Sequence, residues 1–426
     1  SERSDAEQRV VRTSGDFPML AEGRSNLYKL FVERAQCLVN PSGVVALLTP
    51  SGIAADKGAA TFFKSIATSG RLGALFDFEN KGKFFPDVHD NFKFVALVFG
   101  ARSRSFEASR CAFYLYDVAE LDVEGRCLEF KSGDFSLLNP NTGAAPVFRN
   151  LRDASLTMRI YRHHPVLVTH LPKSVKKTWP VRFAQGMYNM SSDSDKFITR
   201  DELVRKGYEP TRLGRWKLAD RLAVPLWVGK MIWHFDHRAS GVTVNPYNMQ
   251  VAASSLPSTD LERADPHFVP IPQYWVSVEG NESDLHWVVG FRDITNPTNA
   301  RTAVAAIVPY AQTGNTLCHL LPEDLPAAKA MSYWAPLLLA TMNSLAFDYV
   351  TRQKAKWTHL NWFILEQLPV IAPARFAESL PPAFTTHMRE AGLMNGQHPQ
   401  PTVADFVIPQ VLALSYTAHD LAPFAR

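Results

Sequence analysis

Apolar and polar positions in the first quarter of the chain follow the periods of helices and strands in turn. Residues 26–39 repeat apolar side chains at three- and four-residue spacing, which predicts a helix with one apolar face. Its inward side chains are expected to be Leu27, Leu30, Phe31, Ala35 and Leu38. Residues 43–49 are almost wholly apolar, which is typical of a strand covered on both faces in a parallel sheet. Residues 57–69 predict a second helix, and residues 72–78 and 92–99 predict two further strands.

This order of elements predicts half of an open α/β sheet, because alternating strands and helices imply right-handed parallel crossovers. Ligands of such sheets bind beyond the carboxyl ends of the strands. The polar loop at residues 79–91 leaves one of these ends, yet it carries two adjacent aromatic residues, Phe84 and Phe85. A pair of bulky rings in a charged loop indicates a binding role, and the alternative is a hydrophobic plug beneath the loop.

The pattern changes beyond residue 149. Residues 134–147 predict loop and turn, and residues 150–162 predict a helix. Short strands are then expected at 165–171, 180–183, 223–228, 231–235, 274–278, 285–291 and 302–308, followed by one long helix at 325–353. We therefore predict an α/β part at 1–149, a mixed, β-rich part with a long helix at 150–372, and a proline-punctuated helical tail at 373–426.

The net charge of +4 is unevenly distributed along the 426 residues. Residues 149–238 contain 18 Lys and Arg against 8 Asp and Glu, a local charge of +10, and the remainder carries −6. A basic segment in an otherwise acidic chain suggests a polyanionic partner, and the alternative is a solvated basic face. Aromatic residues interleaved with these cations can stack on bases; they are Trp179, Phe183, Tyr188, Phe197, Tyr208 and Trp216.

The spacing of the cysteines and the length of the apolar runs restrict the kinds of site and the cellular location to be expected. The four cysteines lie far apart and form no Cys-x-x-Cys pair, so the spacing indicates neither a zinc site nor a disulfide framework, and it fits a reducing, cytoplasmic location. No run approaches the ~18 apolar residues of a membrane helix.

The loop at residues 79–91 is called the phenylalanine loop below. Several cations outside it are candidates for contacts to nucleic acid. In residues 229–238, Lys230, His237 and Arg238 either face phosphate or pack a turn. The same segment contains His234 and Asp236, but a metal site is disfavoured because no third ligand cluster lies nearby in sequence.

Two more groups of cations have two readings each. Arg292 either contacts a base edge or pairs with Asp293. Lys354 and Lys356 follow an apolar helix, where cations bind phosphate or simply favour the helix C-terminus.

Two stretches of the first part resemble a known family. The runs LYKLFVERAQCLVNPSGVVALLTPSGIAAD and LFDFENKGKFFPDVHDNFKFVALVFG are similar to the later half of an adenine-N6 DNA methyltransferase domain, as found in single-chain bacterial type IIG restriction–modification enzymes. The resemblance continues through LNPNTGAAPVFR, VPLWVGKMIWHFDHR, VVGFRDITNPTNARTAVAAIVP and HLNWFILEQLPV. It therefore covers most of the chain.

The resemblance implies a function. Residues 1–149 would be the later half of a Rossmann-like methyltransferase sheet, and residues 150–372 a DNA target-recognition domain. Phe85, directly before Pro86, matches the aromatic residue that stacks on an adenine flipped out of the duplex, and Phe84 is the second candidate. Lys81 and Lys83 lie in the same loop. The implied partner is double-stranded DNA, and the implied methyl donor is S-adenosylmethionine.

Two motifs of the family are absent. The chain has neither a glycine-rich cofactor loop nor the Asn/Asp-Pro-Pro-aromatic tetrapeptide, and its four Asn-Pro pairs read as turns. An acidic residue common in the family is replaced by Val228. We therefore assign no catalytic residue and no metal ligand. We expect residues outside this chain, in an N-terminal half of the same enzyme, to hold most of the cofactor, and we expect this chain alone to transfer no methyl group.

Two other functions remain open from sequence. The chain is alternatively a DNA-binding specificity module without its own catalysis, which recruits an enzyme from another chain. A small-molecule methyltransferase with a substrate domain is a third reading, against which the basic segment argues. A nuclease is disfavoured, because no Asp and Glu-x-Lys combination lies on a strand pair.

Overall fold

The computed structural model describes residues 9–20, 26–243, 253–278, 285–309, 312–355, 358–392 and 400–426. The chain forms two compact units. The first comprises Ser1–His163 with Val168–Lys176, and the second comprises His164–Leu167 with Lys177–Arg426. The division lies after residue 163 rather than at 149, and residues 373–426 belong to the second unit.

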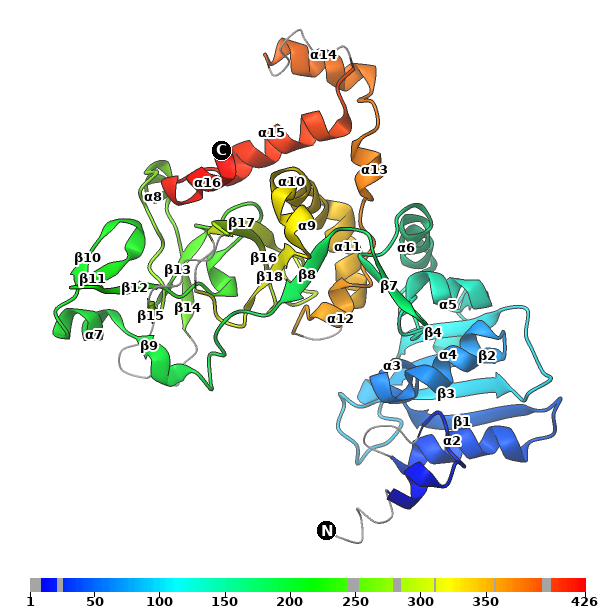
Figure 1. The fold of residues 1–426 in the computed structure, drawn as a ribbon. Coiled ribbons are helices and arrows are strands. Elements are labelled where there is room, and N and C mark those ends of the chain that lie inside the picture. Colours follow the sequence, from blue (N-terminus) through cyan, green and yellow to red (C-terminus); the bar gives the residue numbers. More distant parts are fainter. Residues whose placement is uncertain are drawn as a thin grey trace. The chain divides into compact units, whose positions relative to one another are not determined.

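The first unit contains one mixed sheet and several helices (Figure 1). Its helices are α2 (Leu27–Leu38), α3 (Gly52–Ala55), α4 (Ala60–Thr68), α5 (Ser132–Leu138) and α6 (Leu151–His163). Its strands are β1 (Val44–Pro50), β2 (Leu72–Glu79), β3 (Lys93–Gly100), β4 (Ser109–Leu115) and β5 (Leu128–Phe130), with β6 (Val168–Leu171) and β7 (Ser174–Lys177) pairing as a hairpin. The positions of the three strands and two helices expected between residues 26 and 99 are confirmed within a few residues.

The sheet is mostly antiparallel, which corrects the expectation of parallel crossovers. The strand order is β1-β3-β2-β4-β5, and only the β2–β4 pair is parallel. Strand β3 pairs antiparallel with both β1 and β2. The reason is the connection at residues 80–92, which contains no crossover helix, so the chain turns back beside β2. The mixed α/β class holds, and the parallel architecture does not.

Helices cover the sheet unevenly. Helix α4 packs on the sheet through Phe62, whose ring lies 5.6 Å from that of Phe99 on β3. Helix α5, which the sequence analysis assigned to a loop, packs beside α4. Along β1 the side chains alternate between buried and exposed, with Val44 46% and Leu48 66% exposed. The expectation that this strand is covered on both faces is therefore wrong.

Helix α2 has the reverse of its expected orientation: much of its apolar side is exposed, and charged residues of its polar side are buried. Leu27, Phe31 and Leu38 are 71–75% exposed, whereas Lys29 and Glu33 are buried. Both buried charges have partners: the Lys29 ammonium lies 3.6 Å from Asp56, and the Glu33 carboxylate accepts the backbone N–H groups of residues 19 and 20. The prediction that the apolar face points into this unit is wrong for three of its five members.

The second unit is β-rich, with helices added late in the chain. Its first sheet runs β10 (Glu209–Pro210), β11 (Trp216–Leu218), β12 (Arg221–Pro225), β15 (Trp275–Val278), β9 (Phe197–Ile198). Its second sheet runs β17 (Ala305–Pro309), β16 (Trp287–Arg292), β18 (Leu317–Pro322), β8 (Val181–Ala184), and β13 (Ser240–Thr243) pairs with β14 (Ser254–Pro257). The helices are α7 (Arg200–Arg205), α8 (Asp260–Ala264), α9 (Leu325–Lys329), α10 (Met331–Met342), α11 (Leu345–Lys354), α12 (Trp362–Leu365), α13 (Pro373–Phe376), α14 (Pro382–Glu390), α15 (Val403–Ser415) and α16 (Ala422–Ala425).

Three expectations for this unit are corrected. Instead of one long helix at 325–353 there are three. Ala330 separates α9 from α10, and Ser344 adopts an extended conformation and caps α11 by accepting the N–H of Phe347. Residues 231–235 comprise the end of a short 3-10 helix (Gly229–Met231) and an irregular segment rather than a strand. The aromatics among the cations largely belong to the core: Trp179, Tyr208 and Trp216 are buried. Among the described residues, every helix is too short or too polar to cross a lipid bilayer.

Candidate nucleic-acid interface

The phenylalanine loop of the first unit is held from beneath by one buried side chain, Asn80. Its carboxamide donates to the carbonyl oxygens of Phe85 (2.9 Å) and Val88 (2.6 Å) and accepts the N–H of Phe85 (2.9 Å). The Asn80 residue is fully buried. These three bonds fix the loop where Phe85 leaves it. The sequence analysis missed Asn80, although an Asn-Lys-Gly triplet directly after an apolar strand is a turn signal.

Close packing also constrains the start of the loop. A Cβ atom on Gly82 would lie 1.9 Å from the carbonyl oxygen of Tyr116, so only glycine fits there. The next residue, Lys83, has a left-handed backbone (φ 58°), and its N–H donates to the carbonyl of Asn80 at 2.8 Å. The loop is therefore a defined structure rather than an open excursion.

The two adjacent phenylalanines have different environments. Phe84 points inward, with its ring 5.3 Å from Phe78 and 5.4 Å from Phe94. Phe85 is 43% exposed and rests edge-on against Phe94, with 5.1 Å between ring centroids. Phe94 itself stacks on Phe78 at 5.3 Å. Of the two candidates, Phe85 is the more exposed to a ligand, and Phe84 packs against Phe78 and Phe94.

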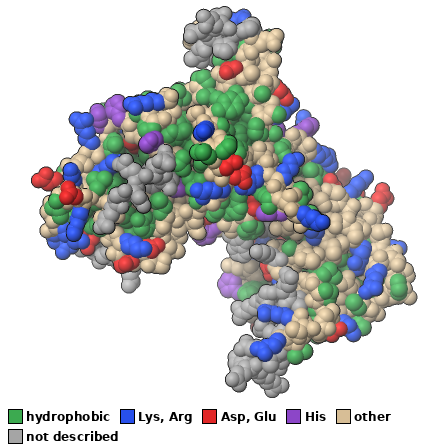
Figure 2. All heavy atoms as spheres, viewed as in Figure 1, with side chains coloured by type: hydrophobic (Ala, Val, Ile, Leu, Met, Phe, Trp, Pro, Cys, Tyr) green, Lys and Arg blue, Asp and Glu red, His purple; other side chains and the backbone are tan. Residues whose placement is uncertain are grey.

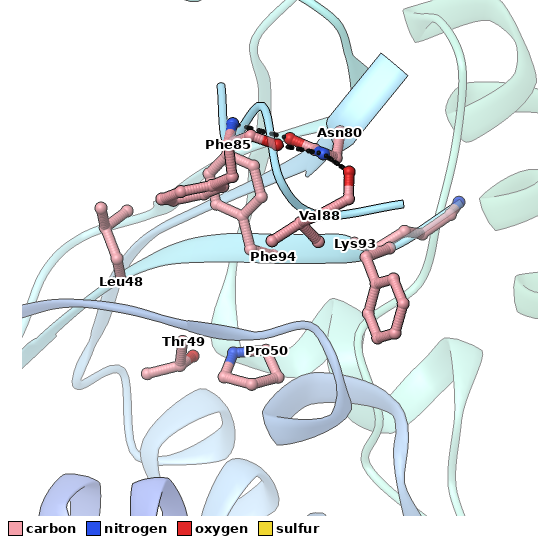
Figure 3. A pocket seen from close by; sticks show the side chains of 9 residues that line it. Leu48, Thr49, Pro50, Asn80, Phe85, Val88, Lys93 and Phe94 are labelled. Carbon is pink, nitrogen blue, oxygen red and sulfur yellow. Dashed lines mark hydrogen bonds between the residues drawn. The ribbon is translucent and has the colours of Figure 1, made fainter. Parts of the chain in front are cut away.

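An apolar cavity of about 250 Å³ opens beside Phe85 (Figure 3). It is lined by Leu48, Thr49, Pro50, Asn80, Phe85, Val88, Phe92, Lys93 and Phe94. The end of β1 thus forms one wall, and the phenylalanine loop with the start of β3 forms the other. This volume lies just below the ~300–1,000 Å³ typical of sites for drug-sized ligands, so the cavity suits one planar ring system.

Cations surround the base of the loop but are partly neutralised. Lys81 lies 3.1 Å and Lys93 2.6 Å from the carboxylate of Glu79, and Lys83 pairs with Asp90. Burial alone would raise the pKa of Glu79, but hydrogen bonds from Lys93 and Lys81 hold that pKa below its ordinary value. Lys81 and Lys83 are exposed, and their contact to phosphate stays a prediction.

Two candidates in residues 229–238 are fully buried and do not face solvent. His237 places Nε2 3.0 Å from both carboxylate oxygens of Asp420. Arg238 donates to four backbone carbonyl oxygens, those of Arg263, Asp265, Phe268 and Thr417. The prediction that these two side chains contact phosphate is wrong; they join α8 to the C-terminal segment. The motif was a turn-packing motif, the alternative reading of the same residues.

Lys230 and Arg292 also have structural roles. Lys230 is half-buried and donates to the carbonyl of Ala253, and burial beside Arg292 lowers its pKa. Arg292 donates to the carbonyls of Gly229 (3.0 Å) and Ile232, and burial lowers its pKa. Its guanidinium also lies 5.2 Å from the ring of Trp233. In this conformation the Arg292 guanidinium bonds backbone carbonyls, and the Asp293 carboxylate lies 2.7 Å from Nδ1 of His359. The base contact of Arg292 stays a prediction.

The last two candidates lie near the end of α11. Lys354 is half-buried and has interactions of its own within the chain. Lys356 lies outside the described residues.

Exposed cations of the second unit gather around its first sheet. They lie on α7, on the turns about β10 and β11, and at the start of β12, namely Arg200, Arg205, Lys206, Arg212, Arg215, Lys217 and Arg221. Figure 2 shows Lys and Arg side chains, with some acidic ones among them, at this end of the unit. We call this set the basic surface. The sequence analysis located its charge but singled out none of these residues.

The described residues do not form a complete cofactor site. A nucleoside linked to an amino acid is a drug-sized ligand that needs several polar partners, whereas the cavity is small and the Asn80 carboxamide is already bonded within the loop. S-adenosylmethionine therefore does not fit here. Among the described residues, no three His, Cys, Asp or Glu side chains are grouped to hold a metal ion.

Comparison with known proteins gives only distant structural similarity. No family model matches the sequence, and no curated protein matches it. The chain is similar to the type IIG restriction endonuclease BpuSI, with 13% identity over 99% of this chain and 51% of that one and a TM-score of 0.32. It is also similar to the type IIL restriction–modification enzyme MmeI in complex with DNA (10% identity, 98% and 52% coverage, TM-score 0.39). The chain thus spans about half the length of these two proteins, and similarity this low carries no functional argument.

Replacing Asn80 by Ala tests the support of the loop. The change removes three partly buried hydrogen bonds to backbone groups of the loop, so we expect the free energy of unfolding to fall by about 1–3 kcal/mol. Urea unfolding measures the loss, and amide hydrogen exchange at Phe85 should accelerate. Asn91→Ala, an exposed position in the same loop, is the control with less than about 0.5 kcal/mol expected. Equal effects of the two changes would contradict this role.

Replacing Arg238 by Met tests its structural role. Four backbone carbonyl oxygens lose the donor that the buried guanidinium supplies, so we expect about 3 kcal/mol of lost stability in urea unfolding. Arg215→Met removes the same charge at an exposed position and should change stability by less than about 0.5 kcal/mol. A fully stable Arg238→Met protein would refute the assignment.

Proposed function

We propose that this chain is part of a site-specific adenine-N6 DNA methyltransferase of a restriction–modification or phage-defence system. The observation that carries the proposal is the half-exposed ring of Phe85, in the Phe-Pro position of the resembled family, at the mouth of an apolar cavity that suits one planar ring.

The environment of the Phe85 ring favours stacking on a base that is flipped out of the duplex. Its ring is held at the edge by Phe94 and from the backbone by Asn80, so little freedom is lost when a second ring covers it. An adenine amino group inside the duplex is not accessible to chemistry, and flipping brings the base to such a platform. The neighbouring Lys81 and Lys83 are exposed in the same loop and would contact the phosphates of the flipped nucleotide.

The basic surface of the second unit would hold the duplex. Its cations are exposed and distributed over a helix and neighbouring strands, as needed for phosphate contacts along a backbone. Phosphate contacts give affinity and register but no sequence information. In a target-recognition domain some side chains bind phosphate and others read the bases. The basic surface would have the first of these roles.

Methyl transfer requires a partner in this proposal. S-adenosylmethionine would be bound mainly by residues outside this chain, and this chain would bind DNA without transferring a methyl group. The second candidate function is a DNA-binding specificity module that recruits catalysis from another chain, which the missing cofactor loop and tetrapeptide favour.

The stacking role of Phe85 predicts a preference for an unpaired adenine. We expect the chain to bind a duplex with one bulged adenine more tightly than the fully paired duplex. Phe85→Ala should reduce this preference about tenfold, because stacking on one ring contributes about 1–3 kcal/mol. Fluorescence anisotropy measures both affinities. Phe85→Trp should retain the preference, and Phe363→Ala, an exposed ring in the second unit, should leave it unchanged. An unaltered preference in Phe85→Ala would sink the stacking role.

The basic surface predicts a defined salt dependence. Replacing Arg212, Arg215 and Lys217 together by Gln should make the slope of log affinity against log salt shallower by about two to three, since each neutralised phosphate contributes about 0.9. Titrations in increasing salt give the slope. Replacing Lys329, Arg375 and Arg389 by Gln removes the same net charge elsewhere in the unit and should change it little. Equal slopes for the two triple variants would contradict the placement of the duplex.

A further inference from the structure

A second cavity of the first unit lies at the end of the sheet away from Phe85. It has a volume of about 510 Å³, and the side chains that matter for its chemistry are Arg104, Phe106, Glu107, Arg110, Glu129 and Lys131. They come from the loop after β3, the start of β4 and the end of β5. Because β4 runs parallel to β2, this cavity lies near the start of β2, whereas the phenylalanine loop leaves the end of β2. The eight residues of β2 span more than about 20 Å, so the two cavities are separate sites.

The loop after β3 is closely fixed where it forms a wall of this cavity. A Cβ atom on Gly100 would lie 2.2 Å from the carbonyl oxygen of Arg104, so the chain turns here in a way that only glycine allows. The N–H of Phe106 donates to the carbonyl of Gly70 at 2.8 Å. The Phe106 ring covers Gly73 of β2, whose Cβ, if present, would be 2.9 Å from the ring. A ligand therefore does not need to order this wall, which lowers the entropic cost of binding.

Two exposed guanidinium groups of the cavity rest on aromatic rings. Arg104 lies 5.3 Å from the ring centroid of Phe106, and Arg110 lies 6.0 Å from that of Phe76. A ring attracts a guanidinium through its flat face, whereas the N–H donors point outward in the plane of the group. Both arginines are thus positioned with donors left for a ligand. Such planar donor groups suit bidentate hydrogen bonds to phosphate or carboxylate oxygens.

The cations of this cavity are not neutralised as those of the phenylalanine loop are. Arg110 stands opposite Glu129 in the β4–β5 pair, but its guanidinium turns to the Cys127 sulfur at 3.9 Å. Within the described part of the chain, neither arginine nor Lys131 forms an ion pair with a carboxylate. Three positive and two negative side chains therefore line the cavity and give it a net charge of +1. An anion that enters it meets donors that no internal partner occupies.

We propose that this cavity binds a free nucleotide, with Arg104, Arg110 and Lys131 on its phosphate groups. The volume lies within the ~300–1,000 Å³ of sites for small ligands, which leaves room for a sugar and a base beside the phosphates. Glu107 and Glu129 then accept hydroxyl or amino groups of the nucleoside, a role that inorganic phosphate would not give them. The assignment does not depend on the proposed function, because the cavity shares no residue with the base-stacking site or the basic surface.

A free nucleotide fits this cavity better than a DNA strand does. A strand carries a phosphate at every nucleotide, and its successive phosphates would pass the exposed carboxylates of Glu107 and Glu129. Like charges brought together in this way disfavour the complex. A nucleotide has phosphates at one end only, so it can direct them to the cations and its uncharged sugar and base to the carboxylates.

Isothermal titration calorimetry of the 426-residue chain with ADP, GDP, CDP and UDP tests the assignment. We expect at least one of them to bind as one molecule per chain and the matching nucleoside, which lacks phosphate, not to bind. Arg104→Gln and Arg110→Gln should each weaken binding about tenfold, because each removes a charge-assisted bond to phosphate. Arg102→Gln removes an exposed cation from the same loop but outside the cavity, so it is the matched control with unchanged affinity. All three positions are exposed, so the midpoint of urea unfolding should stay the same.

The outcomes separate this site from the others in the chain. The inference is overturned if none of the four diphosphates binds, or if both cavity variants bind as tightly as the unaltered chain. Binding that is lost in Phe85→Ala and retained in Arg110→Gln places the nucleotide on the base-stacking ring and also overturns it. DNA affinity that falls in Arg104→Gln and Arg110→Gln but not in Arg102→Gln identifies a DNA strand as the occupant, with the same consequence. A chain that binds a nucleotide as expected but no DNA overturns the proposed function alone.

Discussion

The insertion of β3 between β1 and β2 is the constraint on which the candidate site depends. Its backbone ladders place Phe94 opposite Pro50 on one side and opposite Phe78 on the other. Phe94 is therefore fixed from both sides before the loop contributes anything. Its ring stacks on Phe78 and supports the edge of Phe85. Without the pairing to β1 the cavity would lose the wall formed by residues 48–50, and without the pairing to β2 Phe94 would lose its stacking partner Phe78.

The second unit uses its cations in two distinct ways. Buried guanidinium groups, such as those of Arg238 and Arg292, donate to several backbone carbonyls and thereby connect segments far apart in sequence. Exposed cations, such as Arg215 and Lys217, lie around the first sheet and outnumber the exposed acidic residues there, Asp201, Glu209 and Asp220. Burying a charge is costly unless its hydrogen bonds are satisfied, so the first group is expected to tolerate no substitution, whereas the second tolerates single changes. A count of charges along the chain does not distinguish the two groups.

Sequence reasoning located most elements of the first unit, because the strands are continuous apolar runs and the helices show clear periodicity. It singled out Phe84 and Phe85 because two large rings in a polar loop are unusual, and it preferred Phe85 because the resemblance places an aromatic residue directly before the proline. It failed for the direction of pairing, since a strand's apolar content does not state whether its neighbour is parallel. It also failed for Lys230, His237 and Arg238, because a short motif rich in cations has the same composition whether its charges bind phosphate or carbonyl oxygens. Asn80 was overlooked for a related reason: its three bonds reach backbone groups that every residue possesses.

Helix α2 shows what hydrophobic periodicity can and cannot establish. The pattern correctly separated an apolar from a polar face, but it was silent on what lies against each. In this chain the buried charges have specific partners in Asp56 and the 19–20 turn, and these bonds orient the helix. The apolar stripe of α2 points outward because Lys29 and Glu33, on the other side of the helix, reach their partners only in this orientation. The hydrophobic free energy of that stripe then becomes available for association, at the same border where β1 ends its sheet.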